Sequence, residues 1–166
     1  MASTTTTSVR EDLEQWAFLS FTFKWAAFYS FALGLLILSG NLTVELLALF
    51  CHKDAYSLGN FGQVWANWHA VGCIYVGLTN LSVARDARAS RGGFGPHARA
   101  AVANNTAFIF GVWGVQNVYY CIVRADLFTP LMWLNAVLCF GTAACSLQAA
   151  RGILDQGVDG CYYKMA

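Results

Sequence analysis

Charged residues are scarce in this chain of 166 residues. Asp, Glu, Lys and Arg together make up 11% of the sequence, and the net charge is +1. Soluble domains carry about 25% charged residues. The low share excludes an ordinary solvated surface, and the near-zero net charge provides no basic field for nucleic acid. The composition therefore predicts a lipid bilayer, and not a nucleic acid, as the partner.

Clustered metal ligands and catalytic groupings are also lacking. The six cysteines form no CxxC pair, and there are only three histidines. A zinc site needs several such ligands together, whereas a cysteine inside an apolar run behaves as a small hydrophobic residue. No serine, cysteine or carboxylate pair stands in a recognisable catalytic arrangement. We therefore expect no metal and no cofactor, and the sequence favours a non-enzymatic protein.

Long apolar segments dominate the rest of the chain. A run of 24 residues makes a helix of about 36 Å, which is enough to cross a hydrocarbon layer of about 30 Å. The sequence predicts a domain of four such transmembrane helices over residues 25–151. The predicted spans cover residues 25–49, 61–84, 100–123 and 128–150.

The flanks of this domain are more polar. Residues 1–24 begin with a Thr-rich stretch and continue into a segment with Trp16, Phe18 and Phe21 between charged residues. Aromatic residues mixed with charges are typical of a membrane interface, so we expect an interfacial amphipathic segment or an extension of the first span. Residues 152–166 form a short polar tail.

Basic residues predict the orientation. Four spans place both termini on the same side as the loop after the second span, and that side holds eight of the ten basic residues. They are Arg10, Lys24, Arg85, Arg88, Arg91, Arg99, Arg151 and Lys164. The positive-inside rule then predicts that both termini lie in the cytoplasm, or in the matrix or stroma of an organelle. Consecutive spans are antiparallel, so the predicted fold is all-α, an integral membrane up-down four-helix bundle.

Small residues recur at the spacing of close helix contacts. Gly, Ala, Ser or Cys at every third or fourth position lets two helix backbones approach each other within a membrane. The predicted contact positions are Ser30, Gly34, Cys73, Gly77, Gly111, Gly114, Gly141, Cys145 and Ala149.

Polar residues inside the spans are candidates for function, because they are expensive in lipid. When residues are placed by helical rise, six of them share the non-cytoplasmic third of the bundle. These candidate ligand-binding residues are Asn41, Glu45, His69, Gln116, Asn117 and Asn135. If they face inward, they form a pocket in which Glu45 and His69 handle protons, because imidazole titrates near neutral pH.

The alternative interpretation is structural. Asn, Gln and His side chains also join helices by hydrogen bonds. A second polar layer occupies the cytoplasmic third of the spans, and two polar layers around an apolar middle are common to membrane bundles. That layer holds Thr79, Asn80, Asn104, Asn105, Thr106 and Gln148.

Three stretches give the chain a resemblance to the DoxX-like group of small four-span membrane proteins. They are GNLTVELLALF at residues 40–50, AVGCIYVGLTNLSVARDAR at 70–88 and PLMWLNAVLCF at 130–140. The resemblance implies a four-span fold and a functionally mixed group that includes accessory subunits of redox complexes. It assigns a role to no individual residue.

Two functions follow from the sequence. The first is a multi-pass, non-enzymatic membrane protein that serves as an accessory or structural subunit and contacts other membrane-protein subunits. The alternative is a small transporter or membrane redox enzyme with a polar pocket on the non-cytoplasmic side.

Overall fold

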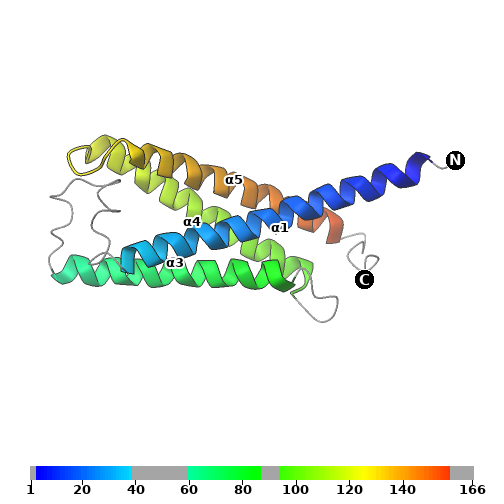
Figure 1. Ribbon diagram of the computed structural model, residues 1–166, viewed down its shortest axis with the longest axis horizontal. Helices are drawn as coiled ribbons and strands as arrows, with labels where there is room; N and C mark the ends of the chain where they lie inside the picture. The colour runs from blue at the N-terminus through cyan, green and yellow to red at the C-terminus, as the bar shows by residue number, and fades with distance from the viewer. Residues whose placement is uncertain (1–2, 39–59, 87–93, 158–166) are drawn as a thin grey trace.

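The computed structural model describes residues 3–38, 60–86 and 94–157, and four long helices make up nearly all of this part (Figure 1). The helices are α1 (Ser3–Leu38), α3 (Asn60–Asp86), α4 (Pro96–Val123) and α5 (Leu131–Gly157). The all-α prediction is confirmed. The predicted spans at 61–84, 100–123 and 128–150 fall on α3, α4 and α5, apart from a few residues at their ends.

Three helices in the described residues are long and apolar enough to cross a membrane: Ala17–Leu38, Pro96–Val123 and Leu131–Asp155. The hydropathy of these helices indicates that the chain is a multi-pass membrane protein. α3 is as long as α5, with 27 residues or about 40 Å. It is less apolar, however, and is not among the three candidate spans. The first span begins at Ala17, earlier than predicted, and its predicted end at 39–49 lies outside the described residues.

The helices are arranged as two antiparallel pairs, α1 with α3 and α4 with α5. The two pairs cross each other (Figure 1). They come together where α4 begins, where α3 and α5 end and where the middle of α1 passes, and they spread apart toward the α4–α5 turn. We call the first region the closed end and the second the open end. The candidate residues described below lie mainly toward the open end.

The closed end is packed with apolar side chains from all four helices, and more than half of them are alanine. Alanines are prominent because they let helix backbones approach each other closely. The buried cluster consists of Leu19, Phe23, Val83, Ala84, Ala100, Ala103, Ala149, Ala150 and Ile153.

The α1–α3 contact confirms the predicted small residues. A Cβ atom added at Gly34 would lie 2.9 Å from the carbonyl oxygen of Ala70, so the backbones of α1 and α3 nearly touch there. A Cβ atom at Gly77 would lie 3.1 Å from the ring of Phe31. Ser30 is fully buried on the same face of α1.

The α4–α5 contact differs from the prediction. Gly114 packs against the ring of Phe140, where an added Cβ atom would approach to 2.8 Å. Gly111 and Gly141, also predicted as contact positions, have no atom within 4 Å of such a Cβ. These two predictions were wrong. The buried face of α4 runs through Phe110 and Gly114 and not through Gly111. The buried face of α5 runs through Thr142 and other residues rotated away from Gly141. The buried positions of this face are Ala136, Cys139, Thr142, Ser146, Ala149, Ala150 and Ile153.

The α4–α5 turn is tight. The backbone N–H of Leu127 donates to the carbonyl of Arg124 at 2.9 Å, and the Arg124 guanidinium pairs with Asp126 at 3.3 Å. The rings of Tyr120 and Phe128 stack across the turn with their centroids 4.8 Å apart. This short connection fixes α4 and α5 as an antiparallel pair.

Candidate functional site

Four of the six candidate residues lie in the described part of the chain. Asn41 and Glu45 fall outside it, so the predicted Glu45–His69 pair stays a prediction. Asn117 and Asn135 belong to one polar cluster, whereas Gln116 and His69 lie elsewhere.

The polar cluster joins three helices around the hydroxyl of Tyr29. This α1 hydroxyl donates a hydrogen bond to the side-chain oxygen of Asn135 in α5. It also lies 3.4 Å from the sulfur of Cys139, one turn further along α5. The amide nitrogen of Asn117 in α4 donates to the same sulfur at 3.6 Å. We call Tyr29, Asn117, Asn135 and Cys139 the Tyr29 cluster.

The Tyr29 cluster leaves little for a ligand to bind. Asn117 and Cys139 are buried, and the amide nitrogen of Asn135 donates to the sulfur of Met132 at 3.8 Å. Each of these amide groups is used within the protein. This arrangement fits interhelical hydrogen bonding, which stabilises membrane helix contacts by about 0.6 kcal/mol per pair on average.

A second interhelical bond lies nearer the closed end. The amide nitrogen of Asn80 in α3 donates to the hydroxyl of Thr106 in α4 at 2.9 Å, and both residues are buried. The single proton of that hydroxyl is shared between the carbonyl of Val102 at 2.8 Å and the side-chain oxygen of Asn80 at 3.2 Å. The amide of Asn80 also donates to the carbonyl of Val76 at 3.0 Å. Of the predicted cytoplasmic polar layer, Asn80 and Thr106 thus meet between helices. The exposed members of that layer are Asn104, Asn105 and Gln148.

Gln116 and His69 stand apart from the Tyr29 cluster. Gln116 is exposed, and its amide donates to the hydroxyl of Tyr120 one turn later on the same helix. His69 is exposed on α3, and its ring meets the edge of the Trp113 ring with the centroids 5.5 Å apart. The structure therefore brings together two of the four candidates that it describes.

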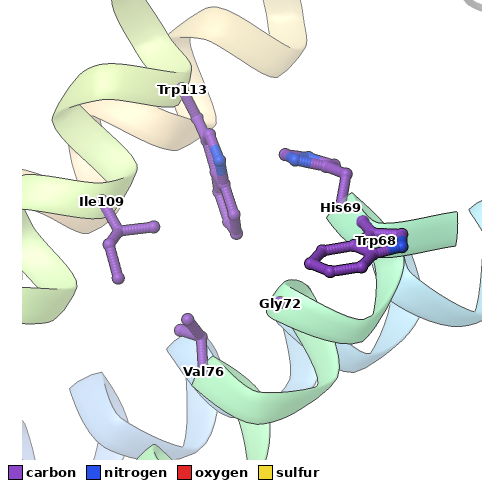
Figure 2. A pocket seen from close by; sticks show the side chains of 6 residues that line it. All are labelled: Trp68, His69, Gly72, Val76, Ile109 and Trp113. Atoms are coloured by element: carbon purple, nitrogen blue, oxygen red, sulfur yellow. The ribbon is translucent and has the colours of Figure 1, made fainter. Parts of the chain in front are cut away.

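His69 lines a groove between α3 and α4 (Figure 2). The groove has a volume of about 380 Å³ and is shallow and widely open. Its lining residues are Trp68, His69, Gly72, Val76, Ile109 and Trp113. In Figure 2 the Trp113 side chain extends from α4 toward α3, and His69 reaches toward it from the opposite wall. We call this cavity the α3–α4 groove.

Metal ligation has no support among the described residues, where no three His, Cys, Asp or Glu side chains gather to hold an ion. Comparison with known proteins gives no further assignment. No protein-family model, curated protein sequence or solved structure matches this chain. The resemblance to the DoxX-like group accordingly stays a prediction.

Sequence reasoning missed the aromatic residues that organise these sites. Tyr29 lies in an apolar run, and a phenol in that position usually needs a hydrogen-bond partner, which was an available signal. The indole N–H of Trp25 likewise donates to Thr142 of α5 at 3.0 Å. Trp113 contacts both His69 and Phe110, and no spacing in the sequence indicated that contact.

Proposed function

We propose that this chain is a non-enzymatic subunit of a larger membrane assembly, with all four helices crossing the bilayer as an up-down bundle. The observation that carries the proposal is the exposed face of α3. This helix has the length of a span but is less apolar than the three candidate spans. Its exposed face requires a cover more polar than lipid.

The exposed face of α3 combines aromatic and polar side chains. Trp68 and Tyr75 are exposed there, together with Asn67 and His69. Lipid offers no hydrogen-bond partner for an amide or an imidazole, so exposing them to hydrocarbon is costly. A neighbouring protein helix supplies such partners and packs well against aromatic rings. We therefore assign this face to contact with another membrane subunit.

The Tyr29 cluster favours a structural subunit over a small transporter or membrane redox enzyme. A transporter or redox enzyme needs polar groups that are free to bind a substrate. Asn117 and Asn135 instead bond to partners inside the bundle. Their use as links between helices supports a structural subunit.

Photo-crosslinking tests the proposal. A benzophenone amino acid is placed at Tyr75 of α3, and a matched control carries it at Phe108 of α4. These side chains are 70% and 72% exposed, so the two probes are equally accessible. In native membranes, the probe at position 75 is expected to give a discrete protein adduct and the probe at position 108 mainly lipid adducts.

Mild detergent extraction provides an independent readout. The chain is expected to migrate on native gels at a mass well above that of one copy with its detergent. A monomer without partners, combined with lipid adducts alone at position 75, would contradict the proposed function. The orientation with both termini on the arginine-rich side is tested in the same membranes by protease protection of terminal tags.

A further inference from the structure

The α3–α4 groove has the size and lining of a small-molecule site. Its volume of about 380 Å³ lies within the range of ligand pockets, roughly 300–1,000 Å³. Two indole rings, one imidazole and two aliphatic side chains line it. Figure 2 shows Trp68 and Trp113 on different walls, with Val76 and Ile109 approaching each other at the other side. Indole faces favour a flat ring, and the aliphatic residues favour hydrocarbon.

The depth of the groove in the bilayer limits the kinds of molecule that can reach it. His69 lies nine residues after the start of α3, and Trp113 lies ten residues before the end of α4. At about 1.5 Å per residue, both lie roughly 14 Å from their helix ends, and hence inside a centred hydrocarbon layer of about 30 Å. A phospholipid headgroup does not reach this depth. The ligand is therefore a molecule dissolved in the hydrocarbon itself.

His69 supplies the polar contact. Neutral imidazole offers one N–H donor and one acceptor nitrogen. Its N–H can donate to a carbonyl oxygen, which needs no further partner in this apolar setting. A carbonyl therefore matches the lining.

Gly72 keeps the floor of the groove open. A Cβ atom at this position would meet no atom within 4 Å, so helix packing does not require a glycine here. Glycine costs a helix interior roughly 0.5–1 kcal/mol relative to alanine. Any larger side chain at residue 72 would instead extend into the groove.

From these observations we propose that the α3–α4 groove binds a lipophilic molecule with a flat conjugated ring and a carbonyl oxygen. The ring lies against Trp68 and Trp113, and the carbonyl accepts a hydrogen bond from His69. The hydrocarbon part lies along Val76 and Ile109. The groove shares Trp68 and His69 with the face of α3 that the proposed function assigns to a partner subunit, whereas Tyr75 does not line it, so the crosslinking and binding experiments test the two proposals at different residues.

The test uses the aromatic ketone 6-propionyl-2-dimethylaminonaphthalene and the full-length protein in lipid nanodiscs. Energy transfer from tryptophan to the ketone reports binding. Gly72→Leu fills the groove and is expected to weaken binding at least about tenfold, a change of about 1.4 kcal/mol. Gly111→Leu is the matched control, because Gly111 has equally open surroundings and does not line the groove. It is expected to bind like the wild type.

His69→Phe tests the hydrogen bond separately. It is expected to weaken ketone binding about three- to tenfold, the worth of one neutral hydrogen bond. It should leave the binding of 2-dimethylaminonaphthalene, which lacks the carbonyl, unchanged. Binding by the Gly72→Leu variant that equals the Gly111→Leu control would overturn the site. Equal losses for both naphthalenes in His69→Phe would overturn the role of the carbonyl.

Discussion

The two ends of the helix arrangement are held together in different ways. At the closed end, alanines such as Ala100 and Ala103 bring the helices into direct contact around Ile153. Toward the open end, long side chains span the space between the pairs, as Tyr29 reaches Asn135 and Trp113 reaches His69. Small residues thus give close packing, and large polar or aromatic residues bridge a separation. The bridged region is also where a groove remains.

Removing packing volume at the closed end is expected to have the largest effect. Ile153→Ala empties a site that is 1% exposed and should lower the free energy of unfolding by about 2–5 kcal/mol. Leu154→Ala, a neighbouring residue that is 39% exposed, should change it by less than about 0.5 kcal/mol. Unfolding in mixed detergent micelles with increasing dodecyl sulfate measures both. Equal losses would show that the closed end is not the more tightly packed region.

A contact within one pair comes next. Gly34→Ala places a methyl group 2.9 Å from the Ala70 carbonyl oxygen, which belongs to the backbone and cannot rotate away. We expect a loss of about 1–3 kcal/mol in the same assay. Gly111→Ala has room for its methyl group and should instead stabilise the helix by about 0.5 kcal/mol. If Gly34→Ala also stabilises the protein, α1 and α3 are less closely packed than the 2.9 Å approach at Gly34 indicates.

Removing the hydrogen bonds between the two helix pairs is expected to change the free energy of unfolding least. A double-mutant cycle with Asn80→Leu and Thr106→Val should give a coupling of about 1–1.7 kcal/mol, because both partners are buried and the Asn80 amide donates to the Thr106 hydroxyl at 2.9 Å. The corresponding cycle with Tyr29→Phe and Asn135→Leu should give about 0.6 kcal/mol. A larger coupling for the second cycle would mean that the bridging side chains contribute more than the buried pair.

The course of the helices was predictable from the sequence, because long uncharged runs permit few structures in lipid. Close packing was also predictable where small residues of two helices met, as with Gly34 on α1 and Cys73 on α3. The prediction of a close contact failed at Gly141, because the sequence pattern of one helix does not say which of several small residues faces the neighbouring helix. That choice depends on the large side chains of the partner helix, such as Phe140 against Gly114.

In the candidate site, the sequence predicted how far along its helix a residue lies but not the direction in which its side chain points. Residue counting placed Gln116 and Asn117 at nearly the same depth, but adjacent helix positions differ by about 100° in direction. Asn117 consequently enters the bundle and Gln116 faces outward. The meeting of Asn135 with Tyr29 depends on how the two pairs cross, which no local pattern encodes.

The length of α1 has a mechanical consequence. The helix begins fourteen residues before its candidate span, so its first turn lies about 21 Å beyond the point where the span starts. A stiff helix carries any tilt of the span to this far tip. A tilt of about 10°, well within the spread seen for membrane helices, moves the tip by about 4 Å. A small reorientation of the span therefore produces a larger displacement at the N-terminal turn of α1.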